Sequence, residues 1–157
     1  MCGSDVFVRS WGRVEGLNEG IYYYDPFKHR LLLLSPEARL SKDIHVPFVY
    51  QPIFEQAAFS IFLIADLDAI GPMYGEHAIR LCTLEAGYMG QLLMSGAAAG
   101  DLGLHPVGMI EFDSIRSLFK LKDNHVLVHS LLGGVPEYQA NCPEGDGEEN
   151  VWEEGIL

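Results

Sequence analysis

A tyrosine and a pair of histidines are the side chains in this sequence best placed to carry out chemistry. Tyr74 lies in the segment MYGEHAIR, directly before a long apolar run. A phenol is a poor base at neutral pH, but it can donate a proton, or accept one where a neighbouring group stabilises the phenolate. His125 and His129 share a face if their segment is a β-strand, but no third ligand stands beside them. We therefore predict no metal site.

The apolar run that follows Tyr74 is a candidate for a membrane-spanning helix. Residues 81–100, LCTLEAGYMGQLLMSGAAAG, carry one charge, and Gly96 and Gly100 form a G-x-x-x-G pattern. However, Glu85 and Gln91 interrupt the run, and flanking aromatic and basic anchors are missing. The run therefore predicts a helix buried in a soluble protein. A carboxylate inside such a helix needs a partner, so we expect Glu85 to bridge elements or subunits.

The elements around these residues alternate between strand and helix without a regular β-α-β repeat, so we predict the α+β class. Phe59 to Ala65 is a continuous apolar run of strand length, which indicates a central strand covered on both faces. The remaining expected elements are an edge strand at 6–13, a hairpin of 21–24 and 31–34, a helical turn at 36–40, a loop at Gly71-Pro72, a helix at about 74–99, a strand at 105–110, a helix at 113–119 capped by Asp113, and a strand at 125–132.

Charge and cysteine content exclude several classes of function. The 157 residues hold 22 acidic and 10 basic side chains, a net charge of -12, which disfavours nucleic acid and anionic membranes as partners. Half of the excess lies in residues 144–157, so we predict an acidic, flexible tail at 138–157. Three cysteines without a C-x-x-C pattern, and no visible secretory signal, predict a reducing, cytoplasmic location.

Two blocks of the sequence resemble a known family. The run FSIFLIADLDAIGPMYGEHAIRLCTLEAGYMGQLL, followed by LGLHPVGMIEFDSIRSLF and HVLVHSLLGG, is similar to the C-terminal half of nitroreductase-superfamily flavoproteins. Within the superfamily, the chain most resembles azoline dehydrogenases of the SagB/McbC type, above all the oxidase domains of nonribosomal peptide synthetases. The resemblance implies a nitroreductase-like mixed sheet around a long buried central helix at residues 1–137, without the N-terminal part of that fold.

The resemblance also implies a function. Such enzymes use FMN to oxidise a carrier-bound thiazoline or oxazoline to a thiazole or oxazole: a proton leaves the ring carbon and a hydride passes to flavin N5. By this resemblance Tyr74 is the catalytic proton acceptor, and Met73 stands where the group has a lysine. The turn that approaches the flavin ring is matched by Pro106, Val107, Gly108 and Met109.

Alternatives follow from what the sequence does not match. The family's phosphate-binding arginines have no counterpart at the matching positions, and Arg9, Arg13 and Arg80 are the arginines near the matched elements. A dimerisation or interaction module without cofactor is therefore the second hypothesis, and an NAD(P)H-dependent nitro- or quinone reductase is the third. The superfamily builds its flavin sites at a homodimer interface, so we expect a homodimer.

Overall fold

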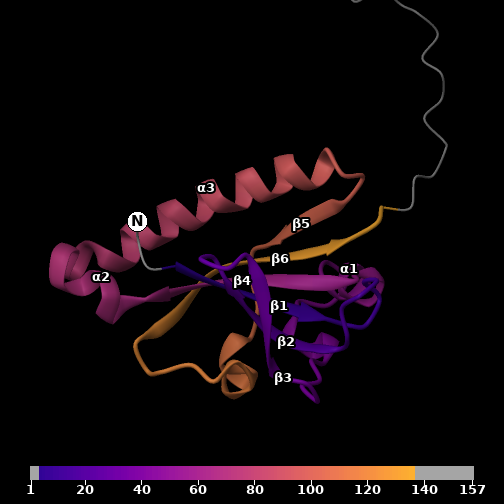
Figure 1. The fold of residues 1–157 in the computed structure, drawn as a ribbon, viewed down its shortest axis with the longest axis horizontal. Coiled ribbons are helices and arrows are strands. Elements are labelled where there is room, and N and C mark those ends of the chain that lie inside the picture. Colours follow the sequence, from indigo (N-terminus) through magenta and orange to yellow (C-terminus); the bar gives the residue numbers. More distant parts are fainter. Residues whose placement is uncertain (1–3, 137–157) are drawn as a thin grey trace, which may run out of the picture.

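The fold is one six-stranded sheet with helices on both faces (Figure 1). The computed structural model describes residues 4–136. Neighbouring strands follow the order β3-β2-β1-β4-β6-β5, and every pairing is antiparallel, where a mixed sheet was expected. The α+β class is confirmed. The elements are β1 Ser4–Ser10, β2 Gly20–Asp25, β3 Arg30–Ser35, α1 Gln51–Gln56, β4 Phe59–Asp66, α2 Leu67–Tyr74, α3 Ala78–Ala98, β5 Gly103–Val107 and β6 His125–Gly134, with 3₁₀ turns at Lys42–Ile44, Gly75–His77, Phe112–Ser114 and Arg116–Phe119.

β4 lies in the middle of the sheet, as its apolar run predicts. Its side chains alternate between the two faces of the sheet. Phe62 and Ile64 belong to a hydrophobic cluster that also contains Phe54 of α1 and Phe119 of a 3₁₀ turn. Ile61 and Leu63 point the other way, into the cluster beneath α3. Both faces of this strand are therefore covered, and the expected central strand is confirmed.

β1 was expected at an edge of the sheet, and this expectation is wrong. Phe7 faces Tyr23 of β2 on one side and Phe62 of β4 on the other. The hairpin of β2 and β3 is confirmed, and the carboxylate of Asp25 accepts hydrogen bonds from the amides of its turn. The hairpin, and not β1, therefore supplies one edge of the sheet.

The long helix α3 packs on the sheet with one stripe of small residues. It begins at Ala78 and not at about Tyr74, because Gly75 adopts a left-handed backbone, with φ 52°, and a 3₁₀ turn precedes the helix. Its 21 residues span about 32 Å, so the helix is shorter than the expected helix at about 74–99. Small residues permit the close approach to the sheet. The buried stripe consists of Ala78, Cys82, Ala86 and Gly90.

Three further expectations about local structure are wrong. The predicted loop at Gly71 and Pro72 is helix α2, which the side chain of Asp66 caps by accepting from two amides. The predicted turn at 36–40 is replaced by the 3₁₀ turn at Lys42–Ile44 and by α1. The predicted helix at 113–119 consists of two 3₁₀ turns, and Asp113 lies inside the first of them and does not cap it.

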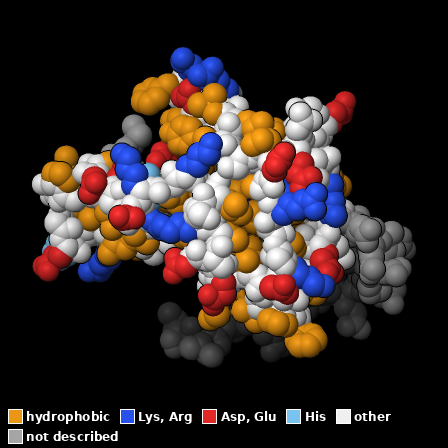
Figure 2. Space-filling view, turned by 90° about the horizontal axis from the view of Figure 1, so that it is seen from below, with side chains coloured by type: hydrophobic (Ala, Val, Ile, Leu, Met, Phe, Trp, Pro, Cys, Tyr) orange, Lys and Arg blue, Asp and Glu red, His pale blue; other side chains and the backbone are white. Residues whose placement is uncertain are grey.

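No helix in the described part of the chain is long and apolar enough to cross a bilayer. Glu85 of α3 accepts a hydrogen bond from the hydroxyl group of Ser4 at 3.5 Å, a contact between the helix and β1 of the bridging kind expected for it. Seen from the side opposite α3, acidic and basic side chains are interspersed over the surface (Figure 2).

Candidate functional site

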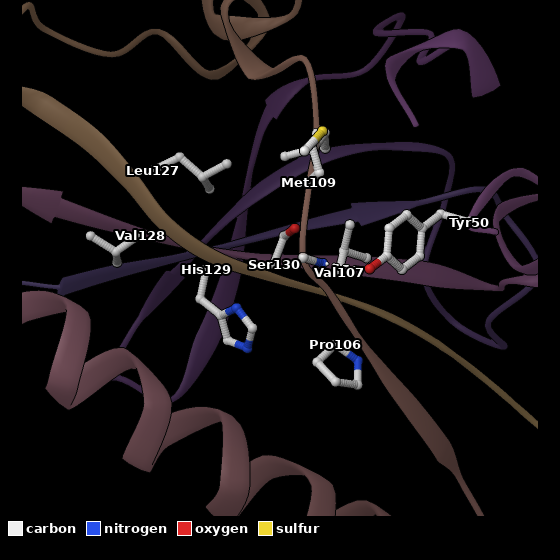
Figure 3. A pocket seen from close by; sticks show the side chains of 10 residues that line it. Tyr50, Pro106, Val107, Met109, Leu127, Val128, His129 and Ser130 are labelled. Carbon is white, nitrogen blue, oxygen red and sulfur yellow. Dashed lines mark hydrogen bonds between the residues drawn. The ribbon is translucent and has the colours of Figure 1, made fainter. Parts of the chain in front are cut away.

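A pocket opens where β5 separates from β6. The two strands pair as far as Val107 and Ser130, after which residues 108–110 turn away. Within residues 4–136, no strand pairs with the adjacent part of β6 on that side. The pocket that results has a volume of about 540 Å³ and is open on one side. Figure 3 shows how its side chains approach from three segments. The lining residues are Tyr50, Pro106, Val107, Gly108, Met109, Ile110, Leu127, Val128, His129 and Ser130.

All four residues predicted to approach the flavin ring line this pocket. Pro106 lies on the edge strand β5, where the missing amide hydrogen is tolerated. Gly108 donates its amide hydrogen to the hydroxyl oxygen of Tyr50, with an N···O distance of 3.1 Å. A Cβ atom at position 108 would stand 3.0 Å from that oxygen, which is tighter than ordinary packing. Glycine at position 108 therefore leaves room for the tyrosine side chain that lies against the turn.

Tyr74, the predicted proton acceptor, is not among the residues that line this pocket. It is the last residue of α2, and 37% of its side chain is exposed. Met73 beside it is also exposed. Within the single chain, the structure does not bring the tyrosine and the 106–109 turn into one pocket.

The two histidines of β6 lie on opposite faces of the sheet. Leu63 faces His129, whereas the next residue, Ile64, faces Leu127. A β-bulge therefore shifts the pairing register between Leu63 and Ile64. His125 consequently lies on the side of Asp66, 3.5 Å from its carboxylate. The expectation that the two histidines share a face is wrong. No group of three or more potential metal ligands occurs among the described residues.

His129 faces α3 at the pocket. A Cβ at Gly90 would stand 3.1 Å from the imidazole ring, so the small helix residue makes room for the histidine. Burial lowers the pKa of His129, which favours the neutral ring. A neutral imidazole offers the pocket one hydrogen-bond donor or acceptor without a charge.

Sequence reasoning missed two polar residues of the pocket. The hydroxyl group of Ser130 is buried and has no hydrogen-bond partner among the described residues. A lone serine in the apolar run HVLVHSLLGG was the available signal for it. Tyr50 had no local signal, because it lies in the Pro47 segment and reaches Gly108 only through the fold.

Among the residues that the structure describes, neither a lysine nor an arginine lines the pocket. Arg9 is buried and forms an ion pair with Glu19 at 2.7 Å. Arg13 donates to the carbonyl oxygens of Glu55 and Ala57. Arg9 and Arg13 therefore both bind groups of the protein itself.

Solved structures share this fold. A protein from Anabaena variabilis, named as a nitroreductase, superposes with a TM-score of 0.73 at 26% identity, over 85% of this chain and 27% of that one. Another, from Ralstonia eutropha and also named as a nitroreductase, gives 0.66 at 19% identity, over 85% and 58%. The Escherichia coli microcin synthetase McbBCD complex with truncated pro-MccB17 bound gives 0.62 at 15% identity, over 84% and 51%. The fold is that of nitroreductase-like oxidoreductases.

The family model for the nitroreductase family matches residues 10–134, and the chain belongs to this family. The Methanocaldococcus jannaschii protein MJ1384, named as a nitroreductase, is 24% identical over 115 residues, which are 73% of this chain. This chain spans 58% of the length of MJ1384 and 27% of the Anabaena protein.

Proposed function

We propose that the chain forms the ring-binding part of an FMN-dependent oxidoreductase that oxidises a thiazoline or oxazoline on a carrier-bound peptide. The observation that carries this proposal is the turn 106–109, whose glycine amide lies at the pocket. The microcin synthetase complex that shares the fold has a truncated precursor, pro-MccB17, bound, which is compatible with a peptide substrate for this chain.

The pocket fits the ring of a flavin better than its phosphate. Apolar side chains of Leu127, Val128 and Met109 suit the faces of a flat ring, and the lining adds the Tyr50 hydroxyl group and the unpartnered hydroxyl group of Ser130. In contrast, a phosphate needs cations or several amides, and no lysine or arginine lines the pocket. A phosphate anchor would therefore come from outside these ten residues.

The residues of the chain have distinct tasks in this proposal. When bound, the flavin supplies the two-electron redox chemistry. Gly108 leaves room for the Tyr50 side chain at the turn, and His129 closes the pocket on the side of α3. Tyr74, exposed at the end of α2, accepts the proton of the substrate ring in place of the absent lysine.

An absorbance spectrum of the purified protein, with the released cofactor identified, tests the proposal. We expect a flavin spectrum, with FMN as the released compound. Tyr74→Phe is expected to retain the flavin and to lose azoline turnover by roughly a hundredfold or more, as removal of an acid-base group does. A Tyr74→Phe protein with unchanged turnover would exclude this residue as the proton acceptor.

We further propose that two copies associate through the outer face of α3. Leu84, Tyr88 and Leu92 follow one another at four-residue spacing and are 53%, 72% and 73% exposed. Such a stripe of large apolar side chains is typical of a surface that a partner covers. We expect a dimer in analytical ultracentrifugation and a monomer for Leu92→Lys. A dimer that persists in the variant would place the interface elsewhere.

The absence of lysine and arginine from the pocket lining favours one other function, a nitroreductase-like interaction module without cofactor. A well-folded dimer that shows no affinity for FMN in a fluorescence titration would support it. NADPH consumption with a quinone would instead indicate a general reductase.

In the proposal, residues 1–137 form the domain and the cysteine content supports a cytoplasmic location. The predicted tail, 138–157, lies outside the described residues.

A further inference from the structure

The side chain of Tyr50 contacts the 106–109 turn at the pocket. Its oxygen accepts the Gly108 hydrogen at 3.1 Å, and Tyr50 itself belongs to the pocket lining. Figure 3 shows the phenol ring reaching toward Val107 and the turn, with its oxygen at the near end. The amide that the family resemblance would direct at the flavin is therefore already bonded to a side chain.

The phenol ring is held in place from two sides. Its centroid lies 5.9 Å from the ring of His105 and 6.4 Å from that of His45, which is itself buried against Phe54. A ring packed in this way keeps its hydroxyl oxygen near position 108. The bond between Tyr50 and Gly108 is therefore part of the framework of the pocket.

A phenol that accepts one hydrogen bond still has its own hydrogen to donate. Among the described residues, the bond from Gly108 is the one hydrogen bond that the Tyr50 hydroxyl group forms. Its hydrogen can therefore be offered to a ligand in the pocket. Donation by Gly108 to the oxygen also polarises the O–H bond, which makes it a better donor.

We propose that Tyr50 is a positioning residue for the bound ring. Its hydroxyl group donates a hydrogen bond to the acceptor nitrogen N5 of an isoalloxazine, while the hydroxyl oxygen accepts a hydrogen bond from the Gly108 amide. This inference rests on the proposed flavin function. It assigns to a side chain the recognition that the family resemblance gives to the main chain. The alternative, direct donation by Gly108, requires the ligand to break the bond between Gly108 and Tyr50.

Two ring-only ligands and one substitution separate these possibilities. Lumiflavin is the flavin ring without the phosphate-bearing chain, so its binding does not depend on a phosphate anchor. In 5-deazalumiflavin a C–H group replaces N5, which removes the acceptor. Fluorescence titration gives the dissociation constant of each ligand for the wild-type protein, for Tyr50→Phe, and for the matched control Tyr24→Phe, whose hydroxyl group contacts His29 at the β2–β3 hairpin.

We expect wild type and Tyr24→Phe to bind lumiflavin roughly two- to tenfold more tightly than 5-deazalumiflavin, the range for one neutral hydrogen bond. In Tyr50→Phe this preference is expected to disappear, because the hydroxyl group that donates a hydrogen bond to N5 has been removed. If Tyr50 only stabilises the pocket, Tyr50→Phe would weaken the binding of both ligands equally and leave the preference for lumiflavin intact.

A preference that survives in Tyr50→Phe overturns the inference in favour of direct donation by Gly108. If Tyr50→Phe does not fold, the wild-type protein alone still tests the idea, since equal binding of the two ligands means that no donor reads N5. Failure of the wild-type protein to bind lumiflavin and FMN refutes the proposed function together with this inference. Binding without an N5 preference refutes the inference alone.

Discussion

The buried histidine beneath the pocket makes the stability of the protein depend on pH. The His45 side chain is 4% exposed, and neither ring nitrogen has a hydrogen-bond partner among the described residues. Burial lowers the pKa of His45 to about 4, from an ordinary value of 6.5. Protonation would place a charge among the aromatic rings of Tyr50 and Phe54, and no described residue forms an ion pair with His45.

The sign and size of the effect follow from proton linkage. Between pH 6.5 and pH 4 the unfolded chain binds a proton at His45 that the folded protein does not bind, so acidification favours unfolding. This contribution to stability is fully present above pH 6.5 and is lost as the pH falls toward 4. At pH 5.0 the loss relative to pH 7.5 is about 2 kcal/mol, and the full difference is about 3 kcal/mol.

Urea unfolding at pH 7.5, 6.0 and 5.0 measures this contribution directly. We expect the free energy of unfolding of wild type to fall by about 2 kcal/mol more between pH 7.5 and 5.0 than that of His45→Phe, which cannot take up the proton. His77→Phe is the matched control, because the His77 side chain is 70% exposed, and it should follow wild type. Parallel pH profiles for wild type and His45→Phe would refute the reasoning.

Three further substitutions give predictions for urea unfolding. Gly133→Ala should lose about 1–3 kcal/mol, because its Cβ would stand 2.4 Å from the ring of Phe59, whereas Gly87→Ala, with no atom within 4 Å, should gain up to about 1 kcal/mol. Equal stabilities of these two variants would contradict the packing. Asp66→Ala should lose about 1 kcal/mol, since Asp66 caps α2 and accepts from Asn124, and no loss would show that the cap is dispensable.

Elements with strong local signals could be predicted from the sequence. The apolar run of β4 and the Asp25-Pro26 turn of the hairpin each specify their structure within a few residues. Helix α2 was missed because Pro72 indicates a break, although the cap at Asp66 starts a helix that ends two residues after the proline.

The candidate site was predictable only in part, because it depends on contacts between distant segments. The turn 106–109 was found through family resemblance, and the structure places all four residues in one pocket. The bulge that separates His125 from His129 is a property of the pairing between β4 and β6, and no local pattern encodes it. The meeting of Tyr50 with Gly108 likewise requires the folded chain.

The strand order has a consequence for how the protein is made. β4 pairs with β6, so that Phe59 faces Gly133. In the described part of the chain, β6 is the one strand that pairs with β5. During synthesis the ribosome releases β1 to β4 long before β6 emerges, and until then one edge of β4 is unpaired. The unpaired backbone N–H and C=O groups of this apolar strand are therefore a temporary aggregation hazard. The pocket between β5 and β6 can form only when synthesis of the described segment is nearly complete.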